Sequence, residues 1–581
     1  MIDRWITDDT SSPRFQYFTR ANADEVGPEP FSPLGWTLGW VKGCIPGVAD
    51  GFVKFGVVHR HELKADQPEV FMNWGGYFYN GLSLPRLMGV RMPGATPEAI
   101  DRAYFGDHPG VPPFVPDQRD EDEGLSAKLG ETMAWVMSTD GYPDMEDWAV
   151  RARQTRLDRP DLGALSDAEL VAYARSMAPN IYGSWVPYCE ICLGASLGPG
   201  AVQAICAAVG RSDAAVPLLS AVGHVDSADA SLRAWDLSRL VASSAALSAA
   251  FDAGVHGLAD RLRAATDADV VGFVAGFDDL LLAFGHRGPN EWDMMPHSWE
   301  TKPEIPLGMI DHLRHQDDGR SPALAARRAA AERERLTTEL SELTKGDDVT
   351  HGTLMAGIRS AGIWLALRER GKNTVIRYIN EAKVAFMELG RRMVARGVIT
   401  DPQKIFMLLD EELDAFLADP GSFPGTIAER AETFAVLHEL EPPYIVDVFA
   451  GCPPISTWKR RDAAGDAVAV TVGEVLQGAA AAPGVVTGRA RVVLDPSEPG
   501  DLDVDDIMVV HTTDPSWTPL FLSVGGVVCD VGAVASHAAI VSRELGVPCA
   551  VSVVDATKRI PNGATITLDG STGAVTVVAL P

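Results

Sequence analysis

The sequence predicts a multidomain protein in which a mainly α-helical part, residues 1–458, precedes a linker, 459–470, and a small α/β unit, 471–581. Apolar residues recur at helical spacing in the first part, whereas short Val/Ile/Thr-rich runs bounded by Gly, Pro and Asp fill the last. The stretch KRRDAAGDAVA lies between them and has the composition of a linker. With 581 residues, 46% of them hydrophobic, the chain can form several cores.

Two neighbouring segments carry the clearest helical pattern. Across 375–393, apolar positions recur at alternating steps of four and three, which predicts an amphipathic helix that ends near Gly397. Residues 354–365 show the same pattern, so we expect Gly371 to mark a kink or a tight link between two packed helices. The charged run 322–343 predicts a solvent-exposed helix.

The two ends of the chain differ from this helical part. The first hundred residues are rich in Gly, Pro and aromatic residues, and PEPFSPLGWTLGW predicts ordered loops rather than regular elements. After the linker, the runs GRARVVL, DIMVVHTT, GGVVCDV and ATITLD predict strands, and SHAAIVSREL predicts one helix. The C-terminal unit therefore has the size and pattern of an independent small domain.

Charge and cysteine content narrow the class of protein. The 50 Lys and Arg residues against 79 Asp and Glu give a formal net charge of −29, which disfavours binding to nucleic acids and to anionic membranes. The N-terminus lacks the pattern of a signal peptide, and Asp278 and Asp279 interrupt the most apolar stretch, so we expect no membrane anchor. Seven cysteines, an odd number, fit a reducing compartment, and we expect the cytoplasm.

One C-x-x-C pair, Cys189 and Cys192, has two interpretations. No second Cys/His pair at zinc spacing accompanies it, and nothing around it resembles a redox motif. We favour two partly buried helix cysteines over a metal or redox site, and we expect no metal site in this chain.

The most informative stretch of the chain surrounds His537. A strand through 527–528 is followed by a glycine turn at Gly532, and Ser536 is a natural N-cap for a helix whose first residue is His537 and which stops at Gly546. The free N–H groups and the positive dipole end at a helix N-terminus stabilise an anionic group bound to the imidazole. A neutral imidazole is also a competent nucleophile, so His537 is a candidate phosphoryl carrier.

Residues Thr513–Leu520 and Gly532–Pro548 resemble the mobile, or swivelling, phosphohistidine domain of the PEP-utilising phosphotransferases. The family signature reads approximately T-D-P-x-W-T-P-L and then G-G-x-x-S-H-A-A-I-V-A-R-E-x-G-I-P. This resemblance implies that His537 is phosphorylated and that Ser536, Thr513 and Arg543 support the phosphohistidine. Two positions depart from the signature: Ala533 replaces the second glycine, which puts the loop geometry in doubt if that position needs a positive φ, and Ser542 replaces an alanine.

The helical part resembles the substrate-binding domain of rifampicin phosphotransferase and of phenylphosphate synthase-like proteins. The resemblance rests on FTRANADEVGPEPFSPLGW, FGHRGPNEWDMMPHSWETKPE, RERGKNTVIRY and ELGRRMVARGVI, which occur in the family's order. It implies a mostly α-helical acceptor-binding domain followed by the swivelling domain. It further implies two groups of site residues: Arg368, Glu369 and Lys372 beside the acceptor hydroxyl, and His286, Arg287, Glu291, Asp293 and Arg20 as substrate-binding residues. For the first group, the alternative is an ordinary charged helix end. For the second group, the alternative is likewise a polar cluster without a role in the site.

The order of the segments indicates the acceptor and the source of the phosphoryl group. Only 44 residues follow His537, too few for the TIM barrel that handles pyruvate in related enzymes, so we do not expect pyruvate as the acceptor. The TRAN-like segment begins at Thr19, where a rifampicin-type enzyme would already have an ATP-grasp domain of about 300 residues by resemblance, and no Walker-type loop precedes it. We therefore expect a separate ATP-grasp subunit that binds Mg²⁺ and ATP.

This split architecture most resembles phenylphosphate synthase and the cresol-phosphorylating systems. The resemblance implies an ATP-dependent, dikinase-type phosphotransferase in which His537 passes a phosphoryl group to a small phenol such as phenol or 4-cresol, giving an aryl phosphate, AMP and phosphate. Two alternatives remain: a component that phosphorylates an antibiotic or other natural product, and a phosphocarrier or regulatory protein without an acceptor of its own.

Overall fold

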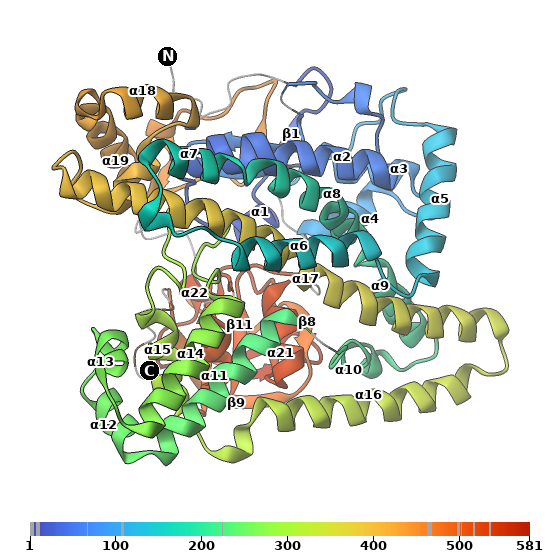
Figure 1. The fold of residues 1–581 in the computed structure, drawn as a ribbon. Coiled ribbons are helices and arrows are strands. Elements are labelled where there is room, and N and C mark those ends of the chain that lie inside the picture. Colours follow the sequence, from blue (N-terminus) through green and yellow to red (C-terminus); the bar gives the residue numbers. More distant parts are fainter. Residues whose placement is uncertain are drawn as a thin grey trace. The chain divides into compact units, whose positions relative to one another are not determined.

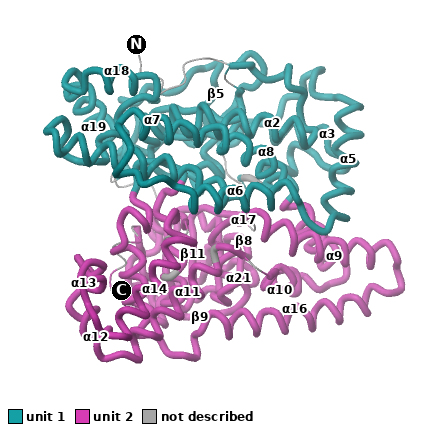
Figure 2. Tube along the Cα trace, viewed as in Figure 1, with its two compact units in different colours: residues 1–194, 292–296, 371–464 teal, residues 195–291, 297–370, 465–581 magenta. Residues whose placement is uncertain are grey.

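The structure is a computed structural model that describes residues 5–6, 12–66, 68–105, 110–223, 225–461, 468–494, 496, 500, 502–514, 517–533 and 536–581 (Figure 1). The chain divides into two compact units (Figure 2). Unit 1 contains residues 1–194, 292–296 and 371–464, and unit 2 contains residues 195–291, 297–370 and 465–581. Most of the chain is helical, and the sheet of the C-terminal segment confirms the predicted α/β region.

The helices of the first half are α1 (Ala23–Val26), α2 (Ile45–Phe55), α3 (Ser83–Arg91), α4 (Pro97–Phe105), α5 (Glu123–Ser138), α6 (Pro143–Leu157), α7 (Asp167–Arg175), α8 (Ala178–Gly194), α9 (Leu197–Ala208), α10 (Ala215–Leu218), α11 (Asp226–Ser243), α12 (Ala245–Asp252), α13 (Leu258–Ala264) and α14 (Ala268–Phe284). Those of the second half are α15 (Glu304–Leu313), α16 (Pro322–Thr344), α17 (Asp348–Ala395), α18 (Leu413–Ala418), α19 (Pro424–His438), α20 (Thr518–Phe521), α21 (His537–Leu545) and α22 (Ala556–Arg559).

The strands are β1 (Tyr17–Thr19), β2 (Phe71–Trp74), β3 (Tyr77–Gly81), β4 (Leu440–Glu441), β5 (Ile445–Asp447), β6 (Lys459–Arg460), β7 (Val475–Gln477), β8 (Ala479–Ala482), β9 (Val485–Val492), β10 (Asp506–Val510), β11 (Gly526–Cys529), β12 (Cys549–Val551), β13 (Thr565–Asp569) and β14 (Ala574–Ala579). All four predicted strands and the predicted helix of the C-terminal segment are present.

Unit 1 combines helices with a small antiparallel sheet in the order β2-β3-β1-β5. Helices α2 and α8 pack closely because Gly51 leaves no side chain in the contact: a Cβ there would lie 2.4 Å from the Cβ of Cys189. The predicted loops at the N-terminus are wrong in part, because Gly35–Cys44 forms a π-helix that continues into α2. Trp36 and Trp40 on this π-helix stack at 5.7 Å and are fully buried, so aromatic packing stabilises a helical segment whose three glycines disfavour it.

Unit 2 contains an eight-stranded sheet in the order β7-β14-β13-β9-β10-β11-β12-β8. Its central strands β9, β10, β11 and β12 run parallel, so their carboxyl ends share one edge of the sheet. Within the same unit, one apolar cluster joins residues of α11, α14 and α15 to residues of β10, β11, α20 and α21. The C-terminal sheet and the helices of residues 195–370 thus pack as one body in this structure.

The predicted boundaries at 458 and 470 separate two domains that we expect to move independently. The two units are defined differently, by the contacts that residues make in one structure. Residues 462–467, in the middle of the predicted linker, lie outside the described part of the chain. The domain boundaries therefore stay a prediction.

Helix α17 runs without interruption from Asp348 to Ala395, so one of the two predicted alternatives at Gly371, a tight link between two helices, is wrong. The helix ends close to the predicted Gly397, which has a φ of 72°. Gly371 has a packing role instead: a Cβ at this position would lie 2.3 Å from Cδ2 of Tyr188, whose ring is buried. The predicted helix at 322–343 is confirmed as α16, and most of its side chains are at least partly exposed.

We expect Gly371→Ala to destabilise the protein by about 1–3 kcal/mol, because the new methyl group overlaps the Tyr188 ring. The matched control is Gly352→Ala in the same helix, where a Cβ meets nothing within 4 Å and where alanine should stabilise the helix by about 0.5–1 kcal/mol. Urea unfolding of both variants measures the difference. Equal stability of the two variants would contradict the packing role.

Among the described residues, one stretch, Asp167–Ala208, is long and apolar enough to cross a membrane by composition. Its most apolar segment of 18 residues has a mean hydropathy of 1.5, and 39% of that segment is buried. In the structure this stretch is three consecutive helices, α7, α8 and α9, separated by turns. Core helices of water-soluble proteins pass the same test, so the stretch is weak evidence for a membrane span. The cytoplasmic location stays a prediction.

Candidate active site

Helix α21 begins and ends where its sequence predicts. The Ser536 side chain accepts a hydrogen bond from the Ala539 N–H at 3.3 Å, which caps the helix and makes His537 its first residue. Gly546 ends the helix in the left-handed region with a φ of 68°. Ala533, the departure from the family glycine, is not among the residues with positive φ, so its loop carries no strain at that position.

The imidazole of His537 is buried, with 4% of the residue exposed, and it contacts two other segments of unit 2. Its Nε2 lies 3.2 Å from the hydroxyl of Thr518, the first residue of α20. Its Nδ1 lies 3.9 Å from Oε2 of Glu369, which is buried on α17. The ring thus has a hydroxyl within hydrogen-bond distance of Nε2 and a carboxylate near Nδ1.

This contact is relevant to the two alternatives for Glu369. The carboxylate is buried next to His537, the predicted carrier, and does not lie at an exposed helix end. Thr518 was missed in the sequence, although it belongs to the matched T-D-P-x-W-T-P-L run. Its place in that matched run was the one indication of a role in the site. A separation of 19 positions along the chain does not by itself predict contact between a threonine and a histidine.

Arg543 and Arg368 interact electrostatically in unit 2. Burial, together with the charge of Arg368, lowers the pKa of Arg543 to about 10, so the guanidinium still carries its charge at neutral pH. Arg543 is 2% exposed and donates to the carbonyl of Ala481 on β8 at 3.1 Å. It therefore braces α21 against the sheet, whereas Arg368 on α17 is partly exposed.

Thr513 and Asp514 follow β10 at the carboxyl edge of the parallel strands. Thr513 is 2% exposed, and its hydroxyl has no hydrogen-bond partner among the described residues. Oδ2 of Asp514 accepts a hydrogen bond from the N–H of Asn290 at 3.0 Å. This bond joins the matched signature to the polar loop that contains His286, Arg287 and Glu291.

The polar loop is buried rather than open. His286, Arg287 and Glu291 are 6%, 2% and 1% exposed, and Nε of Arg287 lies 3.5 Å from Oε2 of Glu291. Asp293 belongs to unit 1, where it accepts hydrogen bonds from the N–H of Ser32 at 3.0 Å and from its hydroxyl at 2.7 Å. The four predicted residues thus fall in two separate units.

The remaining predicted residues, Arg20 and Lys372, also belong to unit 1. Arg20 is buried and donates to the carbonyls of Phe78 at 2.6 Å and Gly27 at 2.9 Å, and it pairs with Asp24 at 2.6 Å. These are the contacts of a residue that holds loops together. Unit 2 therefore contains His537, Thr513, Arg543, Arg368 and the loop 286–291, and it places Thr518 and Glu369 next to the ring of His537.

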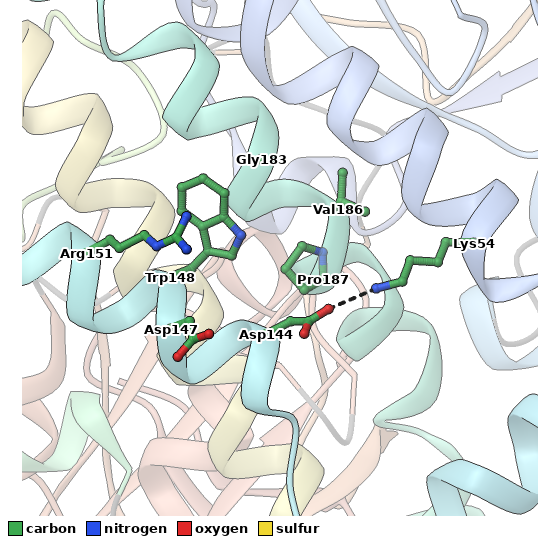
Figure 3. A pocket seen from close by; sticks show the side chains of 8 residues that line it. All are labelled: Lys54, Asp144, Asp147, Trp148, Arg151, Gly183, Val186 and Pro187. Atoms are coloured by element: carbon green, nitrogen blue, oxygen red, sulfur yellow. Dashed lines mark hydrogen bonds and ion pairs between the residues drawn. The ribbon is translucent and has the colours of Figure 1, made fainter.

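Unit 1 contains a surface hollow of about 260 Å³ between α2, α6 and α8 (Figure 3). The guanidinium of Arg151 lies 5.1 Å from the centre of the Trp148 ring, and Lys54 pairs with Asp144 at 3.3 Å. Its lining residues, Lys54, Asp144, Asp147, Trp148, Arg151, Gly183, Val186 and Pro187, include none of the predicted site residues. We do not assign this hollow to the acceptor.

Comparison with known proteins identifies both parts of unit 2. Residues 502–573 match the mobile domain of PEP-utilising enzymes, and residues 190–369 match the fourth domain of rifampicin phosphotransferase. These two parts of the chain are similar to PEP-utilising phosphotransferases. The match to the mobile domain contains His537, and the match to the rifampicin phosphotransferase domain ends at Glu369, the residue that faces it.

Individual relatives show the same pattern. An uncharacterised protein of Mycobacterium tuberculosis (strain H37Rv) is 27% identical over 603 residues, which covers 98% of this chain and 62% of the relative. Rifampicin phosphotransferase of Bacillus subtilis is 29% identical over 303 residues, 52% of this chain and 34% of the relative. Prodigiosin synthesizing transferase PigC of Serratia marcescens is 30% identical over 309 residues, again 52% and 34%. The chain thus spans less than two thirds of the length of each of these relatives.

Proposed function

We propose that this chain is an ATP-dependent, dikinase-type phosphotransferase component in which His537 carries a phosphoryl group to an acceptor hydroxyl. The observation that supports the proposal best is the geometry at the start of α21. The ring of His537 lies at a helix N-terminus, with a hydroxyl beside Nε2 and a carboxylate on the Nδ1 side. Helix N-termini stabilise anions, so a phosphoryl group on this ring is favoured over one on an exposed histidine.

The proposed chemistry has three steps. Nε2 attacks the β-phosphorus of ATP, a P–N bond forms, and the P–O bond to AMP breaks, which leaves a pyrophosphoryl group on the ring. Water then attacks the terminal phosphorus, and the P–O bond between the two phosphoryl groups breaks to release phosphate. The acceptor oxygen finally attacks the phosphorus that is still bound to Nε2, the P–N bond breaks, and the proton of the hydroxyl moves to the Glu369 carboxylate. In sum, acceptor, ATP and water give phosphorylated acceptor, AMP and phosphate.

Nucleotide and Mg²⁺ are expected on a separate ATP-grasp subunit, as the sequence predicts. Bound Mg²⁺ would neutralise charge on the transferring phosphoryl group at that subunit. The test is to purify the chain alone and with a candidate ATP-grasp protein, add Mg-ATP, and measure phosphate on His537 by intact mass. Efficient phosphorylation of the chain alone would refute the need for a partner.

For the acceptor, we propose a small phenol such as phenol or 4-cresol. Incubation of the chain and its partner with Mg-ATP and a panel of phenols should yield an aryl phosphate, detected by its mass. Failure with every phenol, together with a loaded His537, would reject this acceptor class while leaving the carrier role intact.

A hydroxylated natural product is the second candidate acceptor. It is favoured by the match of residues 190–369 to a rifampicin phosphotransferase domain and by the names of relatives that act on rifampicin or make prodigiosin. Rifampicin belongs in the same acceptor panel. Stable phosphorylation of His537 without turnover of any acceptor would instead favour a phosphocarrier or regulatory protein.

Thr518→Val should slow the phosphorylation of His537 about fivefold to tenfold, because it removes one hydrogen bond at Nε2 without changing the shape of the side chain. Thr518→Ser is the matched control and should keep most of the rate, since serine retains the hydroxyl. The initial rate of phosphoryl incorporation from ATP measures both variants. Equal rates for Val and Ser would exclude a role for the hydroxyl.

A further inference from the structure

One face of helix α21 carries the carrier histidine and two further residues. His537, Ile540 and Glu544 are spaced at i, i+3 and i+7, so their side chains lie on one side of the helix. They are 4%, 2% and 6% exposed. The whole face is therefore covered, and in unit 2 it is covered by the helical part, which we define as residues 195–291 and 297–370.

Each of these three residues contacts a different segment of the helical part. His537 faces Glu369 on α17, as described above. Ile540 belongs to an apolar cluster that includes Leu336 of α16 and Ile358 of α17. Oε1 of Glu544 accepts a hydrogen bond from the N–H of Val222 at 3.1 Å. The helix is thus held at its first turn, its middle and its last turn.

The loop that receives Glu544 has a specific shape. Ala221 is one of the few described non-glycine residues with positive φ, at 48°, and its N–H lies toward the same carboxylate as that of Val222. Arg333 of α16 fixes the loop by donating to the carbonyls of Leu218 at 3.1 Å and Ala221 at 3.5 Å. Successive N–H groups in such a turn form a concave site for an anion.

Because the Glu544 carboxylate is buried, its hydrogen bond to Val222 can form in only one position of α21. Burial raises the pKa of Glu544, while the Val222 N–H and the charges of Arg543 and Arg333 act in the opposite direction. A carboxylate in such surroundings is stable only when its hydrogen bonds are made. A shift of α21 along or around its axis would leave the carboxylate buried without the Val222 N–H, so the contact defines one docked position.

We propose that Glu544 is a positioning residue that fixes the docking of α21 on the helical part, so that His537 lies against Glu369 when the phosphoryl group is transferred. The docking contact stands on the structure alone, whereas its catalytic consequence rests on the proposed function. Glu544 acts through the position of His537 and touches no reacting atom.

Amide hydrogen exchange tests the docking contact without any substrate. In Glu544→Ala and Glu544→Gln, the amides of α21 and of residues 216–223 should exchange about tenfold faster than in the wild type, because a hydrogen bond to a charged group is lost. Strands β10 and β11 should keep their protection, which shows that the fold is intact. The control is Glu342→Gln on α16, an exposed carboxylate paired with Lys345 at 3.2 Å, which should change nothing. Unchanged exchange in both Glu544 variants would overturn the proposal.

The rate of transfer tests the catalytic consequence. In chain loaded with phosphate on His537, acceptor-dependent loss of the phosphoryl group should be about tenfold slower in Glu544→Gln, whereas loading from ATP should not be slower. Glu544→Asp, which keeps the charge, should recover part of the transfer rate. Equal slowing of loading and transfer would overturn a positioning role. If the wild type never carries phosphate, the proposed function fails, and the exchange experiment still decides whether Glu544 docks the helix.

Discussion

His537→Ala is expected to carry no acid-labile phosphate and to form no phosphorylated product with any acceptor, since the variant lacks Nε2, the only atom of this chain that bonds to the transferring phosphorus in the proposed mechanism. Intact-protein mass under turnover conditions, before and after mild acid, measures the adduct. Product analysis of the same samples measures transfer.

The control for this result is His256→Ala. His256 lies in unit 2 and is exposed, so its loss should change neither adduct nor product. A phosphoryl adduct of normal occupancy in His537→Ala would place the carrier elsewhere and would reject the function proposed above.

A disulfide between positions 325 and 546 is expected to stop turnover by holding α21 in its docked position. A Cβ on Gly546 would lie 3.3 Å from the Cβ of Ala325 on α16, close to the spacing of about 3.5–4.5 Å found in disulfides. In the oxidised Ala325→Cys, Gly546→Cys variant, loading of His537 from ATP should fall by at least about 100-fold, because a carrier that cannot travel reaches one site only.

Reduction with dithiothreitol should restore loading of the double variant, and mass spectrometry should show the loss of the cross-link. Gly546→Cys alone is the matched control: its left-handed φ of 68° costs a cysteine about 1–2 kcal/mol, so it reports the cost of the substitution without the lock. Loading of the oxidised double variant at the rate of this control would show that His537 is phosphorylated without leaving its docked position.

The local elements of the C-terminal segment could be predicted because each has its signal in adjacent residues. Val527 and Val528 mark a buried strand, Ser536 caps α21, and Gly546 ends it. One of the two alternatives predicted at Gly371, a tight link between two helices, was wrong for a reason that the local sequence does not contain. A glycine inside a helix has the same local cost whether it bends the helix or makes room for a ring, and only Tyr188, far away in the sequence, decides between the two.

The same limit applies to the candidate site. His537 was predicted because the helix start and the family signature coincide at one position. Thr518 was not, because its contact with Nε2 depends on how α20 and α21 pack. Of the four predicted polar residues near Glu291, three belong to unit 2, whereas Asp293, two positions after Glu291, belongs to unit 1. Pairings of this kind are tertiary, and spacing along the sequence does not encode them.

In the proposed cycle, the apolar contact of Ile540 makes the docked position of α21 sensitive to temperature. Leaving the docked position moves a buried isoleucine and its neighbours Leu336 and Ile358 into water, at a cost of about 1.5–3 kcal/mol for the isoleucine side chain alone. Hydration of such surface raises the heat capacity, and the attraction between apolar groups weakens on cooling. In the proposed cycle, cooling therefore weakens the docked position of α21. Temperature should then change the fraction of molecules in which His537 is docked.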